Sequence, residues 1–110
     1  MKLQLRKPQP LERDIQKEIL EYLHRKGYFV WKEHSGGIMV DGGTRYMPIG
    51  LKGKSDILGM TRDGKFLAVE VKRPGGIVSP DQQEFIRQVT FHGGIAIVAY
   101  GIDDVIKAGL

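Results

Sequence analysis

The first part of the chain repeats apolar and polar residues with the period of an α-helix. Its apolar residues recur three or four positions apart, at Leu11, Ile15, Ile19, Tyr22 and Leu23. Residues with this spacing share one face of a helix, which is buried against the rest of the protein. The pattern predicts a helix over residues 11–26, and Gly27 stands in the usual position for its end.

Short apolar runs farther along the chain predict strands. The aromatic and β-branched run over residues 28–31 predicts the first. The runs 56–60 and 65–72 predict two more, and Thr61-Arg62-Asp63-Gly64 between them is typical of a hairpin turn. Residues 95–100 are uniformly apolar, which predicts a buried strand.

The remaining segments predict two more helices and a loop. Ser79 followed by Pro80 and Gln82 predicts an N-cap, a proline in the first turn and a capping box. We expect this helix to end near residue 92, and a short helix over residues 102–110 to close the chain. Residues 35–54 hold six of the fifteen glycines without a clear period, which predicts a long surface loop with a weak strand near residues 45–47.

This order of elements predicts an α/β fold, a mixed central sheet flanked by helices. At 110 residues the chain is expected to form a single domain over 1–110, with residues 1–10 as an extended basic tail. The absence of cysteine excludes disulfides and thiolate metal sites. No apolar run approaches the ~20 residues that cross a bilayer, so we expect a cytoplasmic protein without membrane contact.

The net charge of +4 is concentrated in the middle of the chain, where residues 45–75 hold seven Lys or Arg and three acids. Phosphate binding would explain this pattern, because basic side chains displace the counterions condensed on nucleic acid. A solvated surface explains the same charges. Charge alone leaves both interpretations open.

Two charged residues end the strand predicted over residues 65–72. Side chains alternate along a strand, so Glu70 and Lys72 share one face while Val71 points to the other. If the hairpin is centred on Asp63, the residue directly across from Glu70 is Asp56. A tighter two-residue turn at Asp63-Gly64 would instead put the two carboxylates on opposite faces.

With the wider turn, Asp56 and Glu70 would have Cβ atoms about 4.5–5.5 Å apart. Carboxylates this close repel unless a cation lies between them. Carboxylate oxygens without a cysteine or histidine cluster suit Mg²⁺ or Mn²⁺ rather than Zn²⁺. The Gly53-Lys54 pair just before Asp56 would let a phosphate approach the backbone closely.

Two polar residues at inward helix positions could join this site. Glu12 shares a helical stripe with Ile15, but an acid in a first turn also stabilises the helix dipole. Gln82 shares a stripe with Phe85, but the capping box explains it as well. Both alternatives stay open. Trp31 is expected in the core rather than as a platform for base stacking.

Taken in order, four motifs resemble the PD-(D/E)XK nucleases, and within them the virus-type replication-repair nuclease (VRR-NUC) family. They are Glu12 with Ile15-Gln16, Gly53-Lys54-Ser55-Asp56, Glu70-Val71-Lys72, and Val78-Ser79-Pro80-Asp81-Gln82. The combination is specific, although each motif alone is not, and it covers nearly the whole chain. One departure is Ser55, which stands where the name-giving proline would be. That proline ligates nothing.

The resemblance implies a restriction-endonuclease-like core and a metal-dependent nuclease that hydrolyses DNA phosphodiester bonds with Mg²⁺ or Mn²⁺. Asp56, Glu70, the Val71 backbone carbonyl and Glu12 would bind the metal. Lys72 would position the attacking water, and Gln82 would orient Lys72 or that water. From the basic stretch, the expected nucleic-acid contacts are Arg45, Lys52, Lys54 and Arg73.

Family analogy further implies branched or flap DNA as substrate, Holliday junctions included, a homodimer, and a place in replication, repair or recombination, compatible with a viral or phage origin. The rival interpretation is a non-catalytic nucleic-acid-binding module that keeps the fold, and facing acids beside phosphate argue against it. A sequence-specific restriction-type enzyme is disfavoured because little chain remains for base readout. A nucleotide cofactor is not expected, since Gly42-Gly43 lacks the strand–glycine–helix context.

Overall fold

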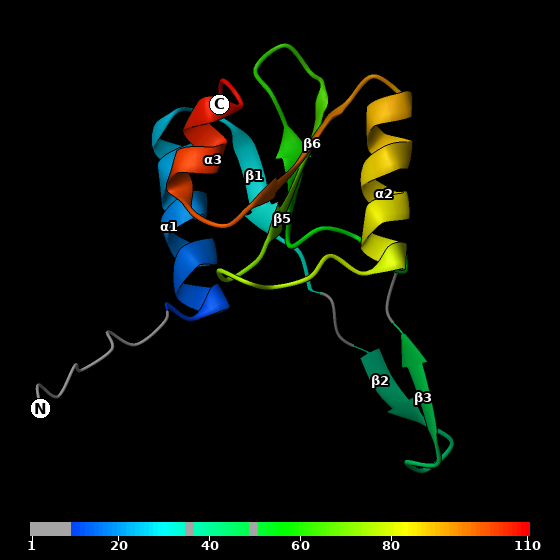
Figure 1. Cartoon of the computed structure of the whole chain (residues 1–110). Helices are drawn as coiled ribbons and strands as arrows, with labels where there is room; N and C mark the ends of the chain where they lie inside the picture. The colour runs from blue at the N-terminus through cyan, green and yellow to red at the C-terminus, as the bar shows by residue number, and fades with distance from the viewer. Residues whose placement is uncertain (1–9, 35–36, 49–50) are drawn as a thin grey trace, which may run out of the picture.

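The computed structural model describes residues 10–34, 37–48 and 51–110 (Figure 1). The tail predicted for residues 1–10 lies outside the described residues except for Pro10. The elements, in chain order, are α1 (Glu12–Arg25), β1 (Phe29–Lys32), β2 (Gly37–Val40), β3 (Arg45–Pro48), β4 (Ile57–Met60), β5 (Phe66–Val71), α2 (Pro80–Phe91), β6 (Ile95–Ala99) and α3 (Ile102–Lys107).

The helices begin and end close to where the sequence predicts. In α1, Ile15, Ile19 and Leu23 of the predicted stripe are buried, whereas Leu11 precedes the helix and is exposed. Gly27 follows the helix with a φ of +87° that an L-residue rarely adopts. In α2, Ser79 is the N-cap of a complete capping box with Pro80 in the first turn. No helix in the described part of the chain is both long and apolar enough to span a membrane.

The turn between β4 and β5 is the wider of the two alternatives. Ile57 pairs with Val69 and Met60 with Phe66, so the hairpin is centred on Asp63. The Thr61 amide donates to the Lys65 carbonyl at 2.9 Å, closing a three-residue loop. Gly64 ends this loop with a φ of +83°, the left-handed conformation that such loops require. The register that sets Asp56 across from Glu70 is confirmed.

The sheet is mixed, as predicted, with strand order β1-β4-β5-β6. Pairing is antiparallel from β1 to β4 and from β4 to β5, and parallel between β5 and β6, which α2 connects. Helices α1 and α3 lie on one side of the sheet and α2 on the other (Figure 1). β5, an inner strand between these layers, is the most deeply buried.

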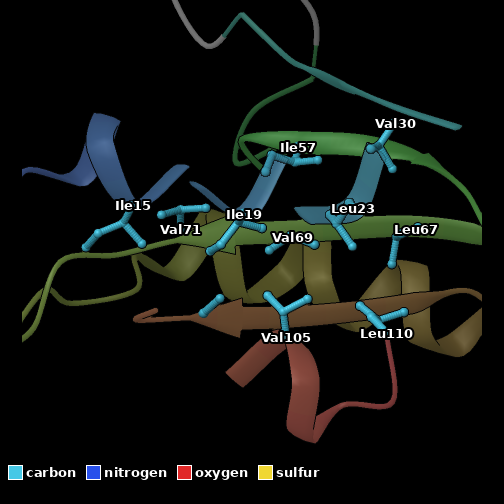
Figure 2. Close-up of a cluster of buried hydrophobic side chains, with 11 residues drawn as sticks. Ile15, Ile19, Leu23, Val30, Ile57, Leu67, Val69, Val71, Val105 and Leu110 are labelled. Carbon is cyan, nitrogen blue, oxygen red and sulfur yellow. The ribbon is translucent and has the colours of Figure 1, made fainter. Parts of the chain in front are cut away.

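Alternation along β5 separates the hydrophobic core from the opposite face. Leu67, Val69 and Val71 point toward α1 and α3 and join the core cluster with Ile19 (Figure 2). Ala68 and Glu70 point the other way, toward the α2 side. The apolar layer therefore closes one side of the strand, and Glu70 is buried on the other.

Two predictions for the outer segments need correction. The loop predicted over residues 35–54 contains an antiparallel hairpin of β2 and β3, in which Met39 pairs with Tyr46. The weak strand near residues 45–47 is confirmed as β3, but its partner was missed. β6 is a strand as predicted, yet only Ala99 in it is fully buried, because β6 lies at an edge of the sheet where neighbouring elements cover it less.

Candidate active site

Three acidic residues lie in a row across one end of the sheet. The register that pairs Ile57 with Val69 continues to Asp56 and Glu70. On the other side of Asp56, the Glu33 amide donates to the Asp56 carbonyl at 2.7 Å, which continues the β1–β4 pairing. Residues paired directly across strands point to the same face. Glu33, Asp56 and Glu70 are thus neighbours on the α2 side of the sheet.

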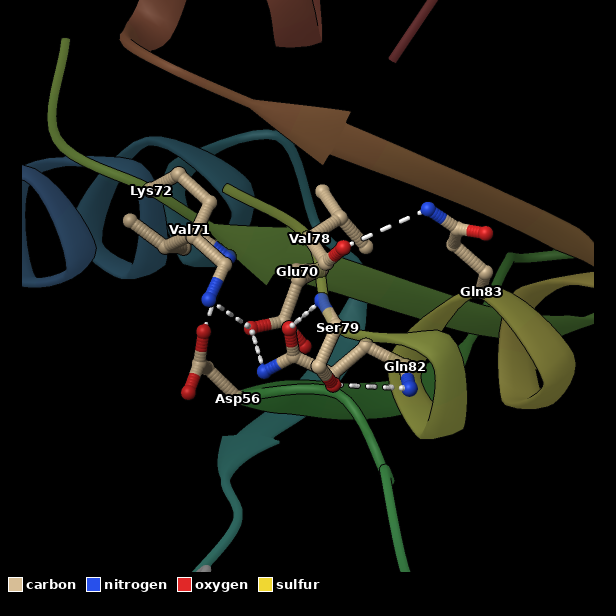
Figure 3. Close-up of polar contacts among 8 residues, drawn as sticks. All are labelled: Asp56, Glu70, Val71, Lys72, Val78, Ser79, Gln82 and Gln83. Carbon is tan, nitrogen blue, oxygen red and sulfur yellow. Dashed lines mark hydrogen bonds and ion pairs between the residues drawn. The ribbon is translucent and has the colours of Figure 1, made fainter. Parts of the chain in front are cut away.

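Glu70 is the most buried charged residue in the described part of the chain, with 1% of its surface exposed. Gln82 Nε2 donates to its Oε1 at 3.0 Å, and Lys72 Nζ lies 3.9 Å from the same oxygen (Figure 3). Its Oε2 is buried and has no hydrogen-bond partner among residues 10–34, 37–48 and 51–110. An unsatisfied buried carboxylate oxygen is costly, so this atom is a candidate ligand for a cation.

Burial and the neighbouring carboxylate raise the pKa of Glu70 to about 8. Loss of hydration is the largest cause, followed by the charge of the close Asp56 carboxylate, while Lys72 acts in the opposite direction and Glu12 adds a smaller increase. The two carboxylates are therefore close enough to compete for one proton. A positive ion between them would remove the repulsion.

Asp56 is oriented by the backbone of β5. Its Oδ2 accepts a hydrogen bond from the Val71 amide at 2.8 Å (Figure 3). This bond fixes the carboxylate beside the strand that carries Glu70 and places the Val71 backbone next to both acids. The residue before it, Ser55, is buried, and its Oγ has no partner among the described residues.

Gln82 serves the helix and the site at once. Its backbone amide donates to Ser79 Oγ at 3.2 Å and its Oε1 accepts from the Ser79 amide at 2.9 Å, which is the capping box. The remaining side-chain group, Nε2, reaches Glu70. The two interpretations of Gln82 are thus compatible. Its contact is with the Glu70 carboxylate, whereas the resemblance implied Lys72 or a water.

Glu12 and Arg73 lie at the edge of this site. Glu12 is half-buried in the first turn of α1, and its charge reaches Glu70, whose pKa it helps to raise. Glu12 and Arg73 line one surface depression together with Arg13. Both interpretations of Glu12, the helix dipole and the site, are consistent with this position.

Gly53 packs against helix α2, which the sequence did not suggest. A Cβ on Gly53 would lie 2.1 Å from the Asp81 carbonyl oxygen and 2.7 Å from the Gln82 nitrogen, and its φ is +73°. Only glycine fits between this loop and the helix terminus. Gly53 therefore brings the segment before Asp56 against the helix that carries Gln82, and close phosphate access is not needed to explain it.

The donor set fits Mg²⁺ or Mn²⁺. No group of three or more His, Cys, Asp or Glu suited to a metal occurs in residues 10–34, 37–48 and 51–110. Mg²⁺ is usually held by one or two carboxylates and keeps several waters. Asp56 and Glu70 meet that requirement, and Glu70 Oε2, which no described residue contacts by a hydrogen bond, supports it. The ligands are too few for a closed structural site.

The four basic residues expected to contact nucleic acid are not equivalent. Lys52 and Arg73 are exposed. Arg45 lies in the β2–β3 hairpin and pairs with Asp41 at 3.2 Å. Lys54 is nearly buried, with 10% of its side chain exposed, and its Nζ donates to Glu33 Oε1 at 3.1 Å. Lys54 is thus engaged by a carboxylate beside the site.

Glu33 and Trp31 are the residues near the site that sequence reasoning missed. Glu33 binds Lys54 through one oxygen and accepts from Trp31 Nε1 through the other at 2.9 Å. These hydrogen bonds lower the pKa of Glu33 and keep it charged. Trp31 was expected in the core, yet 40% of it is exposed. Trp31 and Glu33 are two residues apart, so alternation along one strand would put both on the same face. The strand was predicted to end at Trp31, and Glu33 was therefore not recognised as part of it.

Comparison with known proteins agrees with this architecture. A solved structure described as a VRR_NUC domain protein superimposes with a TM-score of 0.64 and 21% identity, covering 91% of this chain and 85% of that one. At this identity the likeness shows the fold alone. A search of curated proteins found no match. The model of the VRR-NUC domain matches residues 44–103, more than half of the chain and including Asp56, Glu70, Lys72 and Gln82. The chain belongs to the VRR-NUC domain family.

Proposed function

We propose that this protein is a metal-dependent nuclease that hydrolyses DNA phosphodiester bonds and prefers branched or flap DNA, in replication, repair or recombination. The observation that carries the proposal is the meeting of Asp56, the buried Glu70 and Lys72 at one end of the sheet. A module that only binds nucleic acid gains nothing from paired carboxylates, because they repel phosphate. A hydrolase needs them to hold a cation.

Each residue has a defined task in this reaction. Asp56 and Glu70 would hold Mg²⁺ or Mn²⁺ together with the Val71 carbonyl, and Glu12 would complete an outer or second metal position. When bound, such an ion would polarise the phosphate and lower the pKa of its water. Lys72 donates to the attacking water or to the phosphate oxygens, where negative charge develops. Its ammonium is held within 3.9 Å of Glu70, which keeps it at the reacting centre.

Gln82 acts as a positioning residue. Its hydrogen bond to Glu70 Oε1 occupies one carboxylate oxygen, so Oε2 remains for the ion. Because the same side chain caps α2, the position of Glu70 is tied to the start of that helix. The N-terminal ends of α1 and α2 carry Glu12 and Gln82 toward this end of the sheet (Figure 1), and their dipoles favour the negative phosphate.

The first test is cleavage of flap, nicked, junction and linear DNA of one sequence with Mn²⁺, Mg²⁺ or EDTA. We expect cleavage with either ion and none in EDTA. Lys72→Ala and Glu70→Ala should abolish it while DNA binding persists. Matched controls are Lys65→Ala in the β4–β5 turn and Glu84→Ala on the exposed face of α2, which should cleave normally. If the unmodified protein binds DNA without cleaving it, the nuclease proposal is wrong and the non-catalytic binding module is favoured.

We also propose that two copies of the chain associate, so that two sites can act on the two strands of a branched DNA. The β2–β3 hairpin supports this, because it exposes Met39, Tyr46 and Met47 and projects from the rest of the described chain (Figure 1). A two-stranded hairpin alone is marginally stable, and contact with a second copy would cover these side chains. Sedimentation of Met39→Asp beside the parent should show a loss of dimer, whereas Phe91→Asp should not.

A further inference from the structure

No described helix or strand packs on one half of the α2-side face of the sheet. Helix α2 packs on β5 and β6, so its side chains do not cover the part formed by β1 and β4. Trp31 is 40% exposed there and Phe29 67% exposed. Met60, which pairs with Phe29, is exposed as well. The uncovered surface is therefore aromatic at the edge strand β1.

The indole of Trp31 is anchored by its edge. Its Nε1 donates to Glu33 Oε2 at 2.9 Å, and the Phe29 ring lies edge-on with centroids 5.7 Å apart and planes at 75°. Glu33 is itself held by Lys54. A ring fixed in this way loses little freedom when a flat partner stacks on it. Exposed aromatic rings serve nucleic-acid-binding proteins in this manner, because every base has a π-face.

This aromatic surface is continuous with the candidate active site. Trp31 pairs with Leu58, and Leu58 with Ala68, on the same face as the acidic residues. The row of Asp56 and Glu70 lies two residues farther along the strands, a distance of about 7 Å. Neighbouring phosphates of an extended nucleic-acid strand are separated by a similar distance, so one strand could reach both places.

We propose that Trp31 and Phe29 stack on unpaired bases of a strand whose scissile phosphate lies at Asp56 and Glu70. The position of the phosphate rests on the proposed nuclease function, whereas the stacking does not. A second protein chain on this face would sit two residues from the acids and obstruct the phosphate. An unpaired nucleic-acid strand can place a base on Trp31 and a phosphate at Asp56 and Glu70 at the same time. The substrate class is then nucleic acid with single-stranded bases beside the cleavage point.

Trp31 is the only tryptophan of the chain, so its fluorescence reports on this surface alone. The protein is titrated in EDTA with a single-stranded oligonucleotide, with the duplex of the same sequence, and with an abasic strand of equal length. We expect quenching by the single strand and little change with the duplex or the abasic strand, although phosphates are common to all three.

Substitutions test the same contact by affinity. Trp31→Ala should weaken binding of the single strand roughly 5- to 150-fold, the usual loss when one base-stacking side chain is removed. Trp31→Phe should recover most of it. Phe91→Ala is the matched control, because Phe91 is an exposed aromatic at the far end of α2, and it should bind like the parent. Duplex affinity should be nearly the same for all four proteins.

The outcomes separate this inference from the nuclease function. Quenching without any metal-dependent cleavage would support the stacking surface and overturn the nuclease. Cleavage with unchanged Trp31 fluorescence and unchanged affinity of Trp31→Ala would overturn the stacking surface alone. Fluorescence that responds to protein concentration rather than to the oligonucleotide would identify the face as a contact between copies, and it would also overturn the inference.

Discussion

Replacing Glu70 with Gln should stabilise the metal-free protein while abolishing cleavage. In the folded protein the pKa of Glu70 rises from its ordinary value of 4.5 to about 8, mainly because the carboxylate is buried and faces Asp56. Gln has the same shape and no charge. Its oxygen can accept from Gln82 as Glu70 Oε1 does, and its amide can donate toward Asp56. The substitution therefore removes an ionisation with little disturbance of the packing.

The direction of the effect follows from proton binding. Between pH 4.5 and about 8 the folded state keeps a proton on Glu70 that the unfolded chain releases. The contribution of Glu70 to stability is therefore complete below pH 4.5 and is lost as pH rises to about 8. At about 1.4 kcal/mol per pH unit, the upper limit is ~5 kcal/mol. Relaxation and water entry reduce such costs, and we expect a loss of at least ~2 kcal/mol.

The assay is urea unfolding in EDTA at several pH values for the parent and for Glu70→Gln. The difference between their free energies of unfolding should grow steadily from pH 4.5 to 8 and then level. In thermal melting, ~2 kcal/mol corresponds to roughly 8–16 °C in a domain of this size. Glu84→Gln is the control, because hydrogen bonds from Gln88 and Arg87 lower the pKa of Glu84. The difference in free energy of unfolding between this variant and the parent should not change between pH 4.5 and 8. A flat difference curve would refute the electrostatic account of the site.

Three other predictions concern the metal, the basic surface and the loop before Asp56. Mn²⁺ at 100 times its dissociation constant should stabilise the parent by about 2.7 kcal/mol, and an equal rise in Asp56→Asn would place the ion elsewhere. Replacing Lys52 and Arg73 with Ala should flatten the log-affinity against log-salt slope by up to ~0.9 per contact; an unchanged slope means that both are only solvated. Gly53→Ala should cost about 2 kcal/mol or more, and more than Gly75→Ala, which has a similar φ but open space around it. If both substitutions lower the free energy of unfolding equally, the positive φ and not the contact with α2 explains why glycine is needed at position 53.

The sequence alone determined the features that depend on neighbouring residues. The turn from Thr61 to Gly64 is local, with its own hydrogen bonds and a left-handed glycine, although the sequence left two registers open and the structure shows the wider turn. The Ser79 capping box is equally local. With the register, alternation along β5 was enough to place Asp56 across from Glu70.

Contacts between distant segments needed the tertiary structure. The antiparallel pairing of β1 with β4 adds Glu33 to the acidic row and leaves Trp31 exposed, because α2 covers only β5 and β6. The pairing of β2 with β3 was missed because its glycine-rich sequence has no clear period. The engagement of Lys54 by Glu33 spans 21 residues, and no local pattern contains it.

The state of Glu70 shows the division most clearly. Its sequence neighbours predict a strand and a face, which are short-range properties of a backbone with alternating side chains. Its burial and its raised pKa arise only when β6, α2 and the segment before Asp56 close around it. The free energy of a buried charged carboxylate depends on all the groups that replace water around it. The sequence therefore determined where the carboxylate is, and the packing of distant elements determined its charge.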